Sequence, residues 1–430
     1  MGPSGARPPG RDDVERVFRE VYGEAVATLV RVFGDIDLAE DAVQDAFVVA
    51  SDRWQRDGRP PNPAGWIVTT ARHRAIDSLR RAARGRELHG RLGRTGGAEG
   101  DAESGLISGS LAADDEPMSD DRLRLIFTCC HPALRLEHQV ALTLRLLGGL
   151  SVEEVARSFL VSEAAMAKRL VRAKYKIKAA RIPYRVPAAA ELPRRLRSVL
   201  TVLYLIYNTG ADDPGRSPLR REAIRLTRAL RALMPDEPEA RGLLGLLLLS
   251  ESRATARVVD GDVVLLRDQD RTSWDRELID EGMAIVDGVA RRARPGPYQL
   301  QAAIQAVHCS AADFEATDWQ QIVALYDRLF AVMPTPIVAL NRAIAVGEVS
   351  GPGAALVSLD AIGPGMDGYH LAHATRGTML RRLGRPEAAI ASFERAAELA
   401  PTDADRRFLA RQIAELAAGD AAAGSGARAR

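Results

Sequence analysis

Cysteine, histidine and aromatic residues are scarce in this chain of 430 residues. It contains only three cysteines and seven histidines, and aromatic residues make up 5% of it. Three cysteines without a Cys-x-x-Cys pair exclude a disulfide framework and a zinc site of that kind. Cys129, Cys130 and His131 are adjacent, and adjacent side chains on one helix point apart, so we predict no metal site there.

Other absences narrow the class of protein further. The longest apolar stretch, residues 243–249, is too short to span a bilayer, and the first dozen residues lack the apolar core of a secretory signal. We therefore expect a cytoplasmic protein with no membrane partner. The histidines form no partner pattern, and neither a glycine-rich phosphate loop nor metal-ligand spacing occurs. We expect no enzyme activity and no cofactor.

The charge of the chain is nearly balanced in total but uneven along its length. The net charge is +2, yet residues 68–84 hold five arginines against one aspartate. Residues 85–121 hold nine acids against three arginines. Blocks of one sign are typical of surfaces or linkers that meet charged partners.

Helical periodicity nearly throughout the chain predicts an all-α fold, with a hairpin only at residues 257–265. Composition divides the chain into six segments. We expect disordered tails at 1–12 and 417–430, helical units at 13–84 and 120–183, a flexible acidic linker at 85–119, and a helical domain at 184–416.

The second helical unit contains a helix-turn-helix pattern between residues 150 and 178. Ser151 and Glu154 have the spacing of a capping box, and Ser162 can cap the following helix. That second helix has an apolar face and a cationic face with small residues at its leading end. A recognition helix in a DNA major groove needs this arrangement. The alternative is an ordinary solvated basic face.

Two faces of the second helix are predicted from its helical wheel. The packed face consists of Met166, Leu170, Ala173 and Ile177. The opposite face consists of Ala165, Lys168, Arg169, Arg172 and Lys176. Together with Ser162 and Ala164 at the start of the helix, these residues form the predicted DNA-binding face.

The first helical unit contains an acidic helix at residues 38–50, for which Asp37 and Glu40 could form a capping box. Its outer face carries Glu40, Asp41, Gln44 and Asp45 with a few apolar residues. Such a face suits a basic, helical protein partner, although a merely solvated face is the alternative.

The next helix begins at Pro63 behind the cap residue Asn62. We predict that Val68, Ala75 and Leu79 form its inner face. The opposite face is aromatic and cationic, and comprises Trp66, Thr70, His73, Asp77, Arg80 and Arg81, with Thr69 and Arg74 on its flanks. Bases of single-stranded nucleic acid stack on aromatic side chains while arginines follow the phosphates. The alternative is that Trp66 packs against a neighbouring helix; Trp54 is expected in the core.

The last long segment shows a degenerate helical repeat. Within residues 369–401, Gly377, Ala389, Phe393, Ala396 and Pro401 have the spacing of a tetratricopeptide repeat, which the segment resembles. We expect unequal repeats with an insertion near 250–275; an irregular helical domain is the alternative. The apolar run at 192–207 is expected to pack on the helix-turn-helix unit.

Taken together, the two small units resemble regions 2 and 4 of bacterial sigma factors of the extracytoplasmic-function type. The segment 38–47 is similar to the region 2 helix that binds the clamp helices of the RNA polymerase β′ subunit. Residues 62–81 are similar to the helix that recognises and melts the −10 element. Residues 150–174 resemble region 4, which reads the −35 element and contacts the β flap. The long helical domain resembles the tetratricopeptide-like extension of one subgroup, in which the extension is thought to regulate activity.

This resemblance implies roles for the residues named above. Glu40, Asp41, Gln44 and Asp45 would bind core polymerase. The Trp66 face, including Arg74, would hold the −10 strand, and the cationic face at 162–176 would bind −35 DNA. We also expect a regulatory protein or ligand at the repeat domain, and lean towards an extension that is required for activity. Two rival interpretations remain: a dimeric helix-turn-helix regulator with a repeat-type sensor, and a repeat scaffold protein.

Overall fold

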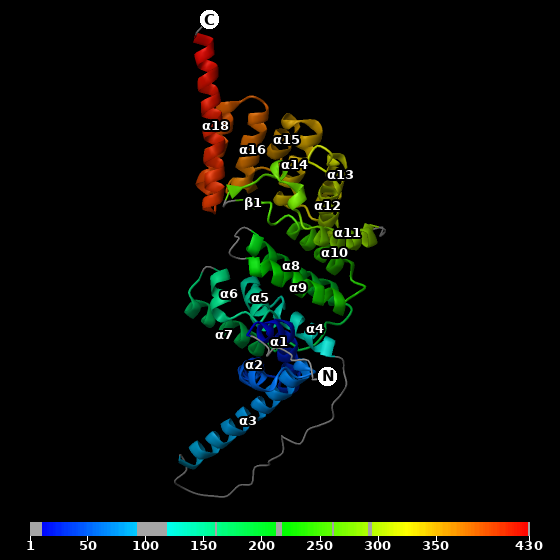
Figure 1. Cartoon of the computed structure of the whole chain (residues 1–430), viewed down its shortest axis with the longest axis vertical. Helices are drawn as coiled ribbons and strands as arrows, with labels where there is room; N and C mark the ends of the chain where they lie inside the picture. The colour runs from blue at the N-terminus through cyan, green and yellow to red at the C-terminus, as the bar shows by residue number, and fades with distance from the viewer. Residues whose placement is uncertain are drawn as a thin grey trace, which may run out of the picture. The chain divides into compact units, whose positions relative to one another are not determined.

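The computed structural model describes residues 11–92, 118–159, 161–211, 217–259, 262–290 and 295–428. It is helical except for one short hairpin in these ranges, which confirms the predicted all-α class (Figure 1). None of the described helices is both long and apolar enough to cross a membrane. The chain divides into two compact units, Met1–Leu233 and Met234–Arg430.

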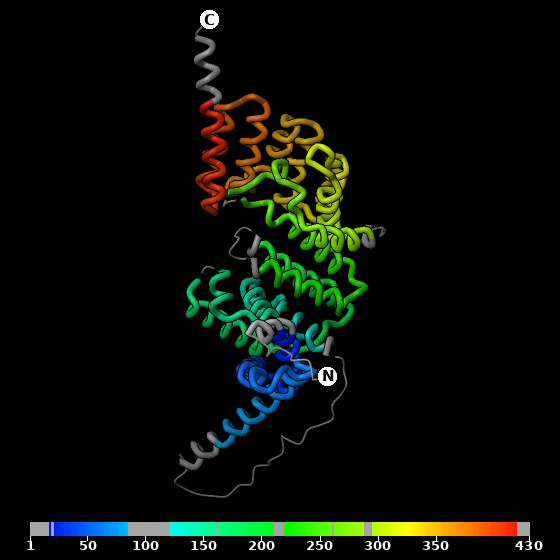
Figure 2. The backbone as a smooth tube through the Cα atoms, in the orientation of Figure 1, coloured from blue at the N-terminus to red at the C-terminus, as the bar shows by residue number. Residues whose placement is uncertain are grey.

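The first unit is a set of helices in which segments distant in sequence pack together (Figure 2). Its elements are α1 (Arg11–Phe33), α2 (Ile36–Asp57), α3 (Pro63–Leu92), α4 (Met118–Cys129), α5 (Leu136–Leu142), the π-helical turn η1 (Thr143–Leu147), α6 (Val152–Ser158), α7 (Glu163–Ala179), α8 (Leu192–Ala211) and α9 (Ser217–Leu233).

Helices α1 to α3 surround a core of small and aromatic side chains. Trp54 is fully buried there, as predicted, and α3 contributes Ile67, Ala71 and Ala75. The prediction for the inner face of α3 is therefore wrong in two positions: Val68 is half-buried and Leu79 is exposed. The buried residues Ile67, Ala71 and Ala75 are each four positions apart, which is slightly more than one helical turn. All three therefore lie on the same face of α3.

The limits of some predicted segments also need correction. Helix α3 continues to Leu92, so residues 85–92 are helical rather than part of a linker. Helix α18 extends to Arg428, although a disordered tail was predicted from residue 417. Residues 11–12 belong to α1 rather than to a tail. The predicted linker residues 93–117 and the tail residues 1–10 lie outside the described ranges.

Helix α8 packs on α4, α5 and α9 within the first unit, as its apolar sequence predicted. Its side chains Val199, Val202 and Ile206 are fully buried. Arg195 donates a 2.6 Å hydrogen bond to the Phe127 carbonyl of α4. Helix α9 is fixed in a similar way, because Arg225 donates to the Leu147 carbonyl at 3.0 Å. Helices α4 and α5, which precede the helix-turn-helix, therefore share one core with the α8–α9 pair.

The second unit consists mainly of helices that each pack on the next helix in sequence. Its elements are α10 (Pro238–Glu251), β1 (Val258–Val259), β2 (Asp262–Val263), the short 3-10 turns η3 (Leu266–Asp268), η4 (Arg271–Ser273) and η5 (Pro364–Met366), and the helices α11 (Arg276–Ala290), α12 (Pro297–Ser310), α13 (Trp319–Val332), α14 (Pro336–Ser350), α15 (Pro352–Asp360), α16 (His370–Arg382), α17 (Pro386–Leu399) and α18 (Asp403–Arg428).

The predicted repeat is formed by α16 and α17. Phe393 is fully buried with Ala389 and Ala396, and its ring packs against Gly377, where an added Cβ would lie 2.7 Å from it. A small residue at 377 therefore lets the two helices approach closely. The predicted hairpin is also present, with Val258 paired to Val263, and it interrupts the helical pairs at the predicted insertion.

Candidate nucleic-acid interface

Helix α7 is positioned by the turn that precedes it. Ser151 and Glu154 form the predicted capping box at the start of α6, with the Ser151 N–H donating to the Glu154 carboxylate at 2.7 Å. Ser162 caps α7, because its Oγ accepts the Ala165 N–H at 3.3 Å. The two caps therefore fix the residues at which α6 and α7 begin.

The two faces of α7 are distributed as predicted. Met166, Leu170, Ala173 and Ile177 are buried. Most of the predicted DNA-binding face is exposed, namely Ser162, Ala164, Ala165, Lys168, Arg172 and Lys176. The helix therefore packs through one side and presents a cationic surface on the other.

Arg169 differs from the other cations of this face. Its side chain is only partly exposed, lies over the Phe159 ring at 5.3 Å, and forms a 3.7 Å ion pair with Glu137 of α5. These contacts hold the guanidinium against the body of the unit. Arg169 is therefore better placed to brace α7 than to reach a base.

Two apolar residues on the exposed face of α7 were missed by the sequence analysis. Val171 is 64% exposed and Tyr175 is 72% exposed, and both project from the side that carries Lys168 and Arg172. The prediction selected charged and small residues only, so it passed over them. Their exposure, together with their helical spacing, marks them as part of the same surface, where an apolar group can contact a thymine methyl.

Helix α3 presents the second candidate surface. Asn62 caps it as predicted, accepting the Gly65 N–H at 2.9 Å. His73, Arg74, Asp77, Arg80 and Arg81 are exposed, and Thr70 is partly exposed.

Trp66 lies between the two predicted environments, an exposed stacking surface and a packed contact with a neighbouring helix. It is half-buried, and its ring meets the core Trp54 edge-on with centroids 5.5 Å apart. The contact with Trp54 fixes the ring at the edge of the core, and part of the indole stays open to solvent. A ring held in this way is preorganised for stacking.

The charged row beside Trp66 is longer than predicted. Asp77 lies 4.0 Å from Arg80, and its carbonyl accepts the Arg81 Nε–H at 3.3 Å. Arg84 lies on the same side of the helix as Trp66, and is exposed. The prediction stopped at Arg81, but one more turn of the same periodicity would have included Arg84.

Some residues on the acidic face of α2 are exposed to solvent, whereas others are bound by neighbouring side chains. Asp41 and Asp45 are exposed, next to Val48, which is 71% exposed. Glu40 is only 5% exposed, and Gln44 donates a 3.3 Å hydrogen bond to it. The predicted polymerase-binding set therefore does not form one uniform surface in this structure.

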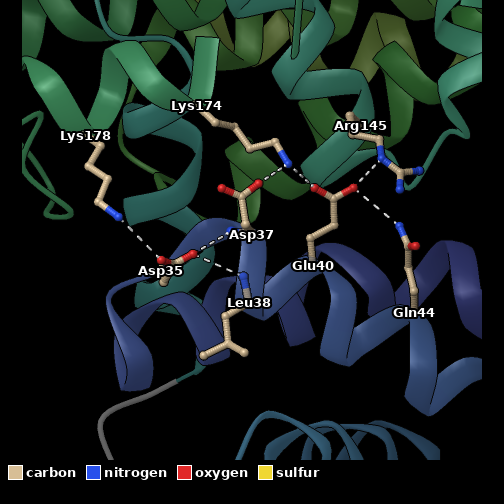
Figure 3. Close-up of polar contacts among 8 residues, drawn as sticks. All are labelled: Asp35, Asp37, Leu38, Glu40, Gln44, Arg145, Lys174 and Lys178. Carbon is tan, nitrogen blue, oxygen red and sulfur yellow. Dashed lines mark hydrogen bonds and ion pairs between the residues drawn. The ribbon is translucent and has the colours of Figure 1, made fainter. Parts of the chain in front are cut away.

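The predicted capping box at Asp37 and Glu40 is wrong, because the helix begins at an earlier cap residue. Asp35 caps α2, its carboxylate accepting the N–H groups of Asp37 at 2.9 Å and Leu38 at 3.1 Å. This places the cap two residues earlier and leaves the side chains of Asp37 and Glu40 available for other partners (Figure 3).

Comparisons with known proteins divide the chain in the same order. A family model for Sigma-70 region 2 matches residues 17–85, one for Sigma-70, region 4 matches residues 124–177, and a family of unknown function (DUF6596) matches residues 195–290. Both candidate surfaces lie within the two Sigma-70 matches.

Two curated proteins and one solved structure are among the proteins similar to the chain. An uncharacterised protein of Rhizobium meliloti (strain 1021) is 43% identical over 406 residues, which cover 92% of this chain and 94% of that protein. The ECF RNA polymerase sigma factor SigK of Mycobacterium ulcerans (strain Agy99) is 28% identical over 183 residues, covering 38% of this chain and 91% of SigK. The solved structure is that of a thermophilic TPR protein of Thermus thermophilus, which is 18% identical to this chain. The match covers 50% of this chain and 96% of that protein, and its TM-score of 0.35 is too low to carry an argument.

Proposed function

Because the chain belongs to the sigma-70 family of RNA polymerase sigma factors, in the extracytoplasmic-function type with a helical C-terminal extension, we propose a separate role in transcription initiation for each of three helices. Helix α2 binds core polymerase through Asp41, Asp45 and the neighbouring Val48, and through Glu40 and Gln44 once these are released. Helix α7 enters the major groove of the −35 element, and α3 holds the −10 strand as it opens.

The observation that carries this proposal is the exposure of two cationic faces whose opposite sides are buried. On α7 the exposed cations Lys168 and Arg172 lie opposite the buried Met166 and Leu170. A helix anchored on one side and cationic on the other fits the major groove. On α3 the half-exposed Trp66 ends a row of exposed cations, as single-stranded DNA requires.

Lys168→Ala and Arg172→Ala test the assignment of α7. Each is expected to weaken binding of the reconstituted holoenzyme to a promoter selected from a random library. A phosphate contact would lower the slope of log K against log salt by about 0.9, whereas a base contact would cost about 1–3 kcal/mol and relax specificity at one position. Binding should be measured over a range of salt concentrations.

Arg157→Ala is the matched control for these variants. Arg157 is an exposed arginine of α6 that pairs with Glu153 at 2.8 Å and lies off the α7 surface. It should leave the salt slope unchanged. Equal promoter binding by the wild type, Lys168→Ala and Arg172→Ala would show that α7 is not the reading helix.

We also propose that the second unit regulates this activity. Support comes from its separation as a compact body that contains neither candidate DNA surface. Regulation through this unit means that its removal changes transcription.

A further inference from the structure

The segment between α10 and α11 reaches across several other helices of the second unit. It comprises residues 252–275, which we call the strap, and it contains the hairpin β1–β2 and the turns η3 and η4. Its two ends meet, because the Asp275 N–H donates to the Ser252 carbonyl at 2.9 Å. The strap is therefore a closed excursion that leaves the row of helices and returns to the same point.

The base of the strap is built into the core of the second unit. Trp274 is only 4% exposed, and the Arg271 guanidinium lies over its ring at 4.8 Å. Arg271 also donates to two carbonyls at the end of α12, those of His308 at 2.8 Å and Ala311 at 2.7 Å. Because hydrogen bonds from a charged donor are stronger than neutral ones, Arg271 and Trp274 anchor this end.

The outer part of the strap is held by ion pairs to two other helices. Arg267 forms a 3.7 Å ion pair with Glu348 at the end of α14. Asp262 accepts hydrogen bonds from Arg407 and Arg411 of α18. Figure 1 shows the hairpin beside the end of α18 at which that helix begins. The strap thus extends from α12, past the end of α14, to α18.

Between Asp262 and Arg267 the strap has the features of a bound peptide. Residues 263–266 read Val-Val-Leu-Leu, and all four side chains are half-buried. Val263 belongs to β2, and Leu265 has an extended backbone with φ −66° and ψ 151°. Extended peptides bind protein surfaces in this way, with apolar side chains against the surface and charges that fix the register.

The outer contacts are weaker than those of the base. The side chains of Asp262, Arg407 and Arg411 are 39%, 54% and 45% exposed, and that of Arg267 is 42% exposed. Exposed ion pairs contribute only about 0–1 kcal/mol each. The hydrogen bond from Arg411 lowers the pKa of Asp262, so the carboxylate stays charged. The outer part of the strap can therefore leave its surface at small cost while the base remains anchored.

We propose that residues 262–267 occupy, within their own chain, a docking surface for an extended segment of another protein. That segment carries a carboxylate, four apolar residues and a cation in this order. Its carboxylate meets Arg407 and Arg411, and its cation meets Glu348. The partner displaces the outer part of the strap and leaves the base in place. An effect of this binding on transcription rests on the proposed function, whereas the binding itself does not.

Competition within the chain determines the expected affinities. A segment tethered beside its site acts at an effective concentration in the millimolar range. A free peptide that binds the open surface with a Kd of about 10–100 µM should therefore bind the wild-type chain about 10- to 100-fold more weakly. A partner has to bind more tightly than the strap's own sequence to displace it.

The test uses a fluorescent synthetic peptide with the sequence of residues 257–270, and its binding to full-length chains is measured by anisotropy. One variant replaces residues 259–267 with the same number of glycines and serines. A second carries Asp262→Lys together with Arg267→Glu. Each is expected to bind the peptide at least tenfold more tightly than the wild type. Asp268→Lys changes an exposed charge of the same strap and should bind as weakly as the wild type.

Further variants test the charges of the docking surface. A peptide in which the aspartate and arginine at 262 and 267 are exchanged should not bind. Arg411→Glu, added to the glycine and serine variant, should weaken binding at least tenfold. Arg395→Glu is the matched control, since Arg395 is an exposed arginine of α17 that pairs with Glu398 at 2.6 Å. Circular dichroism and the melting profile establish that each variant is folded.

The outcomes separate the docking surface from the proposed function. If neither opened variant bound the peptide, or if the wild type bound it equally well, the inference would be wrong. A dimer formed on mixing the wild type with the glycine and serine variant would assign the surface to a second copy of this chain instead of another protein. If the peptide bound as expected while the chain supported no transcription, the proposed function would fail and the docking surface would stand.

Discussion

Replacement of Trp66 by alanine is expected to reduce open-complex formation about 10- to 100-fold while core polymerase is still bound. Stacking of one base on an aromatic side chain contributes about 1–3 kcal/mol, and an unstacked base must be captured if the duplex is to stay open. Permanganate reactivity of thymines in the −10 element measures the effect directly. The holoenzyme should still form, because the open part of the polymerase-binding face lies on α2.

Two control variants separate stacking from packing. Trp66→Phe keeps an aromatic face next to Trp54 and should retain much of the activity. Leu79→Ala removes an exposed apolar side chain from the opposite side of α3 and should have little effect. Normal permanganate reactivity in Trp66→Ala would contradict the melting role of α3, whereas equal losses in Trp66→Ala and Leu79→Ala would indicate a general weakening of the helix.

The position at which the chain is cut is expected to have the largest effect on stability. A chain that ends at residue 187 lacks α8 and α9, uncovers the faces of α4 and α5 on which they pack, and loses the hydrogen bond from Arg225 of α9 to the Leu147 carbonyl of η1. Each large apolar side chain that is uncovered costs about 1.5–3 kcal/mol, and a domain is stable by only about 5–15 kcal/mol. We expect the 1–187 chain to lose cooperative unfolding, and the 1–233 chain to keep it.

Calorimetry of both shortened chains tests this expectation, and transcription tests regulation. If the 1–187 chain unfolded as cooperatively as the 1–233 chain, α8 and α9 would not belong to the first core. The 1–233 chain is also the proper comparison with the full chain in reconstituted transcription. A severalfold change in either direction is expected from a regulatory second unit, and equal activity would remove that role.

Local sequence was a good guide wherever the structure is determined within one helix. The capping box at Ser151, the cap at Ser162 and the buried row from Met166 to Ile177 depend on spacing along a single helix, and all are confirmed. The resemblance to regions 2 and 4 also holds, because it depended on the order of several local patterns. The positions of Gly377 and Phe393 were predictable because both belong to one repeat pattern, which spans the two helices α16 and α17.

The packing of α8 on α4 and α5 was predicted from its apolar sequence, but individual side-chain contacts between distant segments were not. Nothing near Glu40 in the sequence indicates that Arg145 and Lys174 bury it, since both lie more than 100 residues away. Lys174 was passed over because its neighbours on α7 were assigned to DNA. The cap at Asp35 was missed because Asp37 fits the capping pattern equally well. The limit of α3 at Leu92 was missed because glycine and acidic composition suggested a linker, although a helix tolerates isolated glycines.

Reconstituted transcription tests the central claim most directly. Core RNA polymerase that carries no other sigma factor is combined with the full chain, and promoters are selected from a random-sequence library. We predict transcripts from a defined start site that require the chain, and no sequence-specific DNA binding by the chain alone. Specific binding of the free chain to a palindromic duplex, with no transcripts from core polymerase, would contradict the account and favour a dimeric helix-turn-helix regulator.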